Sequence, residues 1–125
     1  MTTYDADIFF IPKDQGLTAG MPAIYAYLQA RGWEIDHEHL LAHGFPVQFL
    51  AASDLTAEAV LQAERIDYEG VPAKVFQAEH IVAIAASVGR AKDKARIEQM
   101  LQQSGLDKTQ LEKILQRHKL KLPTL

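Results

Sequence analysis

The spacing of apolar residues changes near residue 77, and this change limits the folds that the chain can adopt. Before it, short runs rich in β-branched and aromatic residues alternate with turn residues, as in "YDADIFFI" and "RIDYEGVPAKVF". Such runs are typical of strands. After it, apolar residues recur three and four positions apart, the spacing of helices that bury one face. The sequence therefore predicts an α+β protein with a mixed part, residues 1–76, and a helical part, residues 77–125.

The mixed part is expected to hold strands, two helices and two tight turns. "YDADIFFI" predicts a strand, and "MPAIYAYLQARG" predicts a helix, because Pro22 suits a first helical turn. Residues 33–52 predict two strands around a turn near His43 and Gly44. Asp54 is expected to cap a helix over residues 56–64. A hairpin that turns at Glu69 and Gly70 follows.

Three apolar stripes predict three helices in the helical part. The stripes are Ile81, Ile84, Ala85 and Val88; then Ile97, Met100 and Leu101; then Leu111, Ile114 and Leu115. Gly89 and Gly105 are expected to end the first two helices, and Asp107 with Gln110 has the spacing of a capping box for the third. The helical part shows no separate core of its own. The whole chain, residues 1–125, is therefore predicted to form a single domain.

Composition excludes several classes of function. The chain has no cysteine, so thiol catalysis, disulfides and thiolate metal sites are excluded. The net charge of −3 gives no strong nucleic-acid signal. No signal peptide and no apolar run of the ~20 residues that a membrane helix needs is evident. We expect a cytoplasmic protein without a membrane partner.

Two carboxylates, Asp5 and Asp7, lie one residue apart in the first predicted strand. Residues i and i+2 of a strand face the same side, about 6.6 Å apart, so the two charges would repel each other unless a cation joins them. Mg²⁺ binds one or two carboxylates together with water and phosphate oxygens, and paired ions support nucleotidyl transfer. The spacing allows a Mg²⁺ site, but from the spacing alone an ordinary exposed acid pair at a strand end is the preferred interpretation.

A basic segment allows two interpretations. Its residues are Arg90, Lys92, Lys94 and Arg96. Arg and Lys bind phosphate directly. Alternatively, the segment is a solvated helix face on which Asp93 pairs weakly with Arg96, and Lys94 with Glu98.

Histidines give weaker signals. His37 and His39 would face the same side of a strand, and neutral imidazole binds metals. No matching third ligand is evident in the sequence, so surface histidines are the preferred interpretation. Glu79 and His80 begin a predicted helix, where a carboxylate suits the positive helix end. A capping role is preferred there to acid–base catalysis.

Four stretches of the chain carry a resemblance to a known family. They are "TYDADIFFI", "GFPVQFLAASDLTAEAVLQAERIDYEGVPAKVF", "AEHIVAIAASVGRAKDKARIEQML" and "LDKTQLEKILQRHKL". Together they resemble the bacterial minimal nucleotidyltransferase family, which includes AbiEii-type abortive-infection toxins. The resemblance covers nearly the whole chain, and "FPVQFL" and "GRAKDKARI" are its most specific parts. It implies a nucleotidyltransferase-like mixed β-sheet flanked by helices, with a C-terminal group of about three helices.

The resemblance also implies residue roles. Asp5 and Asp7 would be the catalytic carboxylates that bind Mg²⁺ with a nucleoside triphosphate, and Arg90 and Lys92 would contact the phosphates. Family members carry a glycine-rich phosphate cradle about ten residues before the two carboxylates, whereas only four residues precede Asp5 here. Active members commonly carry a third acid on a neighbouring strand, where this chain offers the neutral amide of Gln48.

These departures lead to two functional hypotheses. The first is a truncated or degenerate nucleotidyltransferase-fold protein without efficient catalysis, which binds a nucleotide or a protein partner. The alternative is an active Mg²⁺-dependent nucleotidyltransferase that acts on a protein, an RNA or a small molecule. Expected partners are a second copy of the chain, as a homodimer, or a toxin–antitoxin-like partner.

Overall fold

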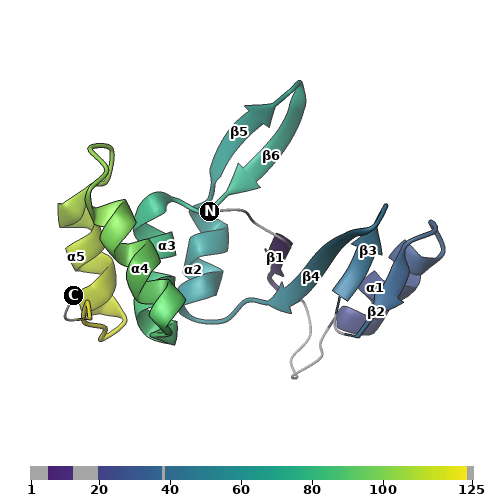
Figure 1. The fold of residues 1–125 in the computed structure, drawn as a ribbon, viewed down its shortest axis with the longest axis horizontal. Helices are drawn as coiled ribbons and strands as arrows, with labels where there is room; N and C mark the ends of the chain where they lie inside the picture. Colours follow the sequence, from purple (N-terminus) through teal and green to yellow (C-terminus); the bar gives the residue numbers. More distant parts are fainter. Residues whose placement is uncertain (1–5, 13–19, 38, 124–125) are drawn as a thin grey trace. The chain divides into compact units, whose positions relative to one another are not determined.

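The structure, a computed structural model, describes residues 6–12, 20–37 and 39–123 (Figure 1). The chain divides into two compact units, Met1–Ser53 and Asp54–Leu125. The predicted α+β class is confirmed, because both units combine helices with strands. The assignment of the whole chain to one domain stays a prediction. No helix of the described residues is long and apolar enough to cross a membrane.

The first unit is built on a four-stranded sheet with the strand order β1–β4–β3–β2. Its elements are β1 (Ala6–Phe10), α1 (Met21–Gln29), β2 (Glu34–Asp36), β3 (His39–Ala42) and β4 (Phe45–Ala51). β1 pairs parallel with β4, and the other two pairings are antiparallel. Parallel neighbours need a crossover connection, and here the crossover contains α1, β2 and β3.

The turn predicted near His43 and Gly44 is confirmed, because it joins β3 to β4. The prediction of two strands in this region is wrong, since β2 adds a third. The chain leaves β2 at His37, which has a φ of 56°, before β3 begins. Leu40 and Val47 are both buried and lie opposite each other in the β3–β4 ladder. This pair gives the sheet an apolar contact between its two central strands.

The second unit packs four helices around one buried apolar cluster. The helices are α2 (Leu55–Leu61), α3 (Ala78–Val88), α4 (Ala91–Leu101) and α5 (Lys108–Arg117). The cluster consists of Leu55, Val82, Ala83, Ala85, Ile97, Leu111, Ile114 and Leu115. Burial of a large aliphatic side chain contributes about 1.5–3 kcal/mol. The cluster therefore holds the four helices together, and it includes the whole stripe predicted for α5.

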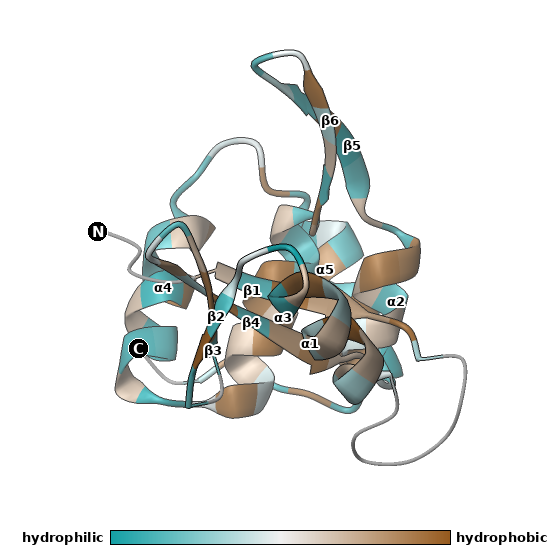
Figure 2. Ribbon diagram, turned by 90° about the vertical axis from the view of Figure 1, so that its right-hand side faces the viewer, coloured by the Kyte–Doolittle hydropathy of each residue, from teal (hydrophilic) through white to brown (hydrophobic). Residues whose placement is uncertain are grey.

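The buried face of α3 differs from the predicted one. Val88, expected in the stripe, is 51% exposed, whereas Val82 and Ala83 are 0% exposed. Glu79 and His80 are also buried. The buried face of α3 therefore includes Glu79 and His80. The prediction missed these two residues because it considered apolar residues only. Figure 2 shows the hydrophobic residues of α3 in brown among the neighbouring helices.

Polar contacts fix the start of α5. Asp107 Oδ1 accepts the Gln110 N–H at 3.0 Å, which confirms the predicted cap. In a complete capping box, the Gln110 side chain would accept the Asp107 N–H. Here that N–H donates to Glu79 at 3.1 Å instead. The Gln110 side chain instead donates to Gln77 at 2.9 Å. Glu79 thus ties the first turn of α3 to the start of α5. Asp54 is the N-cap residue of α2, as predicted, but its side chain makes no capping bond with the helix.

A two-stranded hairpin joins α2 to α3. It consists of β5 (Glu64–Tyr68) and β6 (Val71–Val75), which pair antiparallel. The predicted turn at Glu69 and Gly70 is confirmed, and their φ values are 51° and 84°. Positive φ at both central residues is the signature of the hairpin turn that glycine favours. Figure 1 shows the hairpin extending away from the helices of its own unit.

Candidate functional site

Asp7, one of the two carboxylates predicted to bind Mg²⁺, lies in the β1–β4 ladder. The Cα of Asp7 pairs with that of Gln48. Paired residues of parallel strands project to the same face, on strands about 4.8 Å apart. Asp7 is exposed and Gln48 is half-buried, and the next pair on this face is Phe9 with Leu50. On this face of the sheet, the polar pair of Asp7 and Gln48 is therefore followed directly by an apolar, half-buried pair.

The β1–β4 edge of the sheet, where Asp7 lies beside Gln48, can supply oxygen ligands to a metal ion. Mg²⁺ accepts carboxylate and amide oxygens together with water and phosphate oxygens, so Asp7 and Gln48 fit the chemistry of such a site. The second predicted ligand, Asp5, lies outside the described residues. Among the residues that the structure describes, no group of three or more His, Asp or Glu side chains is arranged to hold a metal ion.

Arg90, a predicted phosphate contact, is engaged at the N-cap of α4. Its Nε–H donates to Asp93 Oδ2 at 2.7 Å, and its backbone N–H donates to the same oxygen at 3.1 Å. The side chain of Asp93 is only 3% exposed. Hydrogen bonding from Arg90 is the main reason why the pKa of Asp93 is lowered, and the charge of Arg96 adds to the effect. Asp93 thus pairs most closely with Arg90, and not with Arg96 as the surface interpretation expected.

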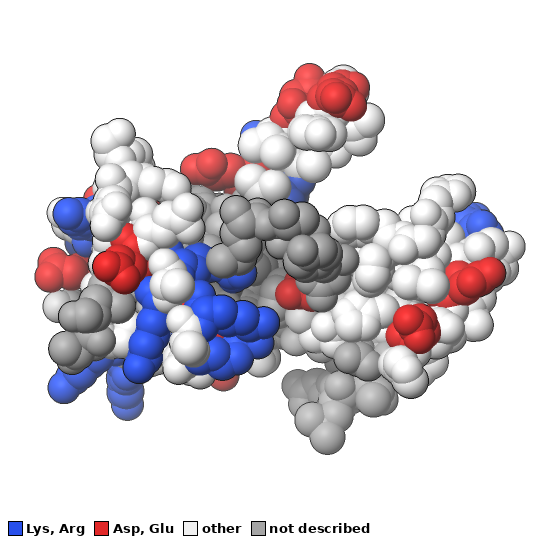
Figure 3. All heavy atoms as spheres, in the orientation of Figure 1, with Lys and Arg blue, Asp and Glu red and all other residues white. Residues whose placement is uncertain are grey.

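The other basic side chains of α4 are exposed. They belong to Lys92, Lys94 and Arg96. Figure 3 shows blue side chains gathered over the region where Figure 1 places α4. Lys92, the second predicted phosphate contact, lies in the first turn of the helix, where the helix dipole also favours an anion.

The histidines near the first sheet do not share a strand face. His37 follows β2 in a left-handed conformation, with a φ of 56°, whereas His39 begins β3. His43 lies in the following turn and is exposed. His37 Nε2 lies 3.8 Å from Oδ1 of the exposed Asp36. The pattern expected for two ligands on one strand is therefore wrong.

A group that sequence reasoning missed converges on the carboxylate of Glu58 in α2. His80 Nε2 in α3 lies 2.8 Å from Oε2. At the end of α5, Arg117 donates to both carboxylate oxygens at 2.9 Å, and His118 Nε2 lies 3.1 Å from Oε1. We call these four residues the Glu58 cluster. Its members are 22 to 60 residues apart from Glu58, so no local motif could reveal it.

The Glu58 cluster is built to hold a negative charge. The Arg117 hydrogen bond lowers the pKa of Glu58 most strongly, and the bonds from His80 and His118 lower it further. Burial acts in the opposite direction, and the resulting pKa is about 2. A carboxylate with so low a pKa is a weak proton acceptor near neutral pH. The cluster therefore joins α2, α3 and α5, and is poorly suited to general base catalysis.

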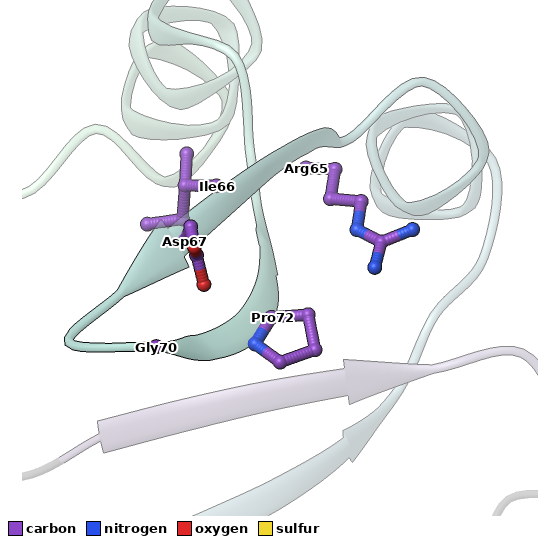
Figure 4. A pocket seen from close by; sticks show the side chains of 5 residues that line it. All are labelled: Arg65, Ile66, Asp67, Gly70 and Pro72. Carbon is purple, nitrogen blue, oxygen red and sulfur yellow. The ribbon is translucent and has the colours of Figure 1, made fainter.

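A hollow of about 380 Å³ lies along the hairpin. Its lining consists of Arg65, Ile66, Asp67, Gly70 and Pro72 (Figure 4). Figure 4 shows Arg65 and Asp67 leaving β5 on the side of Pro72, with Ile66 on the other side. Arg65 and Asp67 are the two charged residues of this lining.

The structure thus brings together Asp7 and Gln48, and separately Arg90 and Asp93. Asp7 belongs to the first unit, whereas Arg90 and Lys92 belong to the second. No family model, no curated protein and no solved structure matches the chain.

Proposed function

We propose that the chain is a nucleotidyltransferase-like protein that binds a Mg²⁺–nucleoside triphosphate weakly at the β1–β4 edge and lacks efficient catalysis. The observation that supports it is the register of Asp7 with Gln48. In the family that the sequence resembles, a third acid stands on the strand beside the two carboxylates. Gln48 occupies such a position, on the same face as Asp7.

The amide explains why the proposed site is weak. Gln48 offers a neutral oxygen. A cation at this edge is therefore attracted by one negative charge fewer than it would be with an acid at position 48. Mg²⁺ neutralises the phosphate charge that develops during nucleotidyl transfer. Loss of one preorganised electrostatic group typically slows an enzyme by about 10²–10³. The family chemistry would therefore proceed slowly even with nucleotide bound.

The basic segment lies in the second unit and supports weak anion binding there, apart from the β1–β4 edge. Arg90 donates to the buried carboxylate of Asp93, so a phosphate would compete with an existing ion pair. Lys92 is exposed in the first turn of α4 and reaches a phosphate as a point charge. We assign any phosphate binding by this segment to Lys92 before Arg90.

Thermal unfolding with and without Mg²⁺ and ATP tests the proposed site. A ligand that binds only the folded state raises the melting temperature. We expect a small increase for the wild type and none for Asp7→Asn. Gln48→Asp should enlarge the increase, because it restores the missing charge. Asp36→Asn, an exposed acid of the same unit, serves as the matched control that leaves the increase unchanged, and Gln48→Asn shows the effect of the shorter side chain alone.

Two results would overturn parts of this proposal. An increase that survives in Asp7→Asn and is unaffected by Gln48→Asp would remove the β1–β4 edge from nucleotide binding. Metal-dependent transfer of labelled nucleotide by the wild type, lost in Asp7→Ala, would show an active enzyme instead.

A further inference from the structure

The β5–β6 hairpin has one apolar and one polar face. Residues directly opposite each other in an antiparallel ladder share a face. Ile66 with Ala73 and Tyr68 with Val71 therefore lie on one face, whereas Asp67 with Pro72 lies on the other. Tyr68 and Val71 are 67% and 63% exposed. An isolated two-stranded hairpin is only marginally stable in water, so this exposed apolar ladder is expected to gain from further strands.

The two edges of the hairpin differ in their hydrogen-bonding groups. Antiparallel pairs that exchange two backbone bonds alternate with pairs that exchange none. Pro72 has no N–H, so its pair with Asp67 is of the second kind, and the backbone groups of both residues point outward. The outer edge of β6 therefore lacks a donor at Pro72. On β5 the outward groups belong to Arg65 and Asp67, and each keeps its N–H and its C=O.

The β5 sequence is complementary to itself. When two copies of "ERIDY" pair antiparallel about Ile66, Arg65 lies opposite Asp67 of the partner subunit, and Asp67 lies opposite Arg65 of the partner subunit. These are the positions whose backbone groups point outward, so the register also allows four backbone hydrogen bonds. Opposite charges placed directly across two strands stabilise the pairing. Ile66 meets its own copy on the apolar face.

We propose that two copies of this chain associate through their β5 edges and form one antiparallel sheet with the strand order β6–β5–β5–β6. The two-fold axis passes between the two copies of Ile66, perpendicular to the sheet. It places both apolar faces on the same side, so the exposed ladders of the two hairpins become continuous. This interface is isologous, with each copy offering the same patch. It is independent of the nucleotide site proposed above.

A charge-swap experiment on the full chain tests this interface. In a dimer of Arg65→Asp, an acid would face an acid at both of these cross-strand pairs. In a dimer of Asp67→Arg, a base would face a base at both. Like charges across strands oppose pairing, so each variant alone should dissociate at least about tenfold more readily than the wild type. An equimolar mixture of the two variants restores both opposite-charge pairs. It should therefore form a heterodimer of wild-type affinity, measured by sedimentation equilibrium.

Controls of the same charge change are available on α5. Lys113→Asp and Glu112→Arg alter exposed residues of that helix and should leave association unchanged. Circular dichroism checks that each variant is folded, and recovery in the mixture requires folded chains. A wild type that stays monomeric at millimolar concentration would overturn the proposal. A dimer that neither variant weakens, or a mixture that does not associate, would overturn it as well.

Discussion

Glu58 shows how one side chain can organise residues that are distant in sequence. Its carboxylate accepts hydrogen bonds from Arg117 and lies within hydrogen-bonding distance of two imidazoles. The Glu58 side chain is 17% exposed, and that of His80 is 0% exposed. Because a carboxylate only accepts, Nε2 is the nitrogen through which His80 donates to it. Nδ1 of His80 has no partner among the described residues.

Replacement of Glu58 by glutamine should destabilise the second unit by about 2 kcal/mol, because hydrogen bonds to a charged group are worth about 1.5–3 kcal/mol. A neutral amide cannot form an ion pair with Arg117. Its NH₂ group would also lie against N–H donors, where the carboxylate oxygens accepted hydrogen bonds. Urea unfolding followed by helical circular dichroism measures the change. Glu112→Gln, at an exposed position of α5, is the control. Equal midpoints for the two variants would show that the Glu58 cluster contributes nothing.

Acid should remove the same contribution. The pKa of Glu58 is lowered from 4.5 to about 2 in the folded chain. The folded state therefore binds fewer protons, and this stabilisation is complete above about pH 5 and is lost as the pH falls toward 2. With allowance for partial exposure, the wild type should lose about 2 kcal/mol more than Glu58→Gln over this range. Parallel stability profiles would contradict the lowered pKa.

At the scale of elements, the local signals in the sequence predicted the turns of the β3–β4 and β5–β6 hairpins and the buried stripe of α5. The turns at Glu69–Gly70 and near His43 depend on neighbouring residues alone. The buried stripe of α5 is also a local pattern. The face of α3 could not be predicted in this way, because Glu79 and His80 are buried through partners elsewhere in the chain. Their partners, the Asp107 N–H and Glu58, are 28 and 22 residues away.

The end of α3 gives a prediction at this scale. Gly89 has a φ of 74°, and its N–H donates to the Ala85 carbonyl at 3.0 Å. A Cβ there would approach only the Ala86 carbonyl oxygen, at 4.0 Å, so the cost of Gly89→Ala is conformational. We expect a loss of about 1 kcal/mol, read from the urea midpoint. Gly105→Ala, which is not in the left-handed region and has open space around it, should be neutral.

For the whole molecule, the strand that carries Gln48 lies beside the strand of Asp7, as expected. The family itself, and a metal-binding role for these two residues, stay proposals. The engagement of Arg90 with Asp93 was not predicted, because the sequence offered Arg96 as an equally spaced partner. A charge pattern on one helix leaves such alternatives open, and only the backbone at the N-cap decides between them.

The division into two units leads to a prediction about folding. All eight residues of the apolar cluster lie between Leu55 and Leu115, within the second unit. The isolated segment 54–125 should therefore keep its helices and unfold cooperatively. A core of this size rarely supplies more than about 3–5 kcal/mol. Urea unfolding followed by circular dichroism and by amide exchange tests it. A gradual transition without a baseline would contradict an independent core.

Pro72 also sets the stoichiometry of the assembly inferred for the hairpin. A sheet that extends by adding strands could in principle continue into a fibre, which is the hazard of exposed edges. In the four-stranded arrangement both outer strands are β6, and each presents the ring of Pro72 where a further strand would need a donor. In the proposed dimer, this missing donor would oppose the addition of further strands. One proline in β6 would thus favour a closed pair over a polymer.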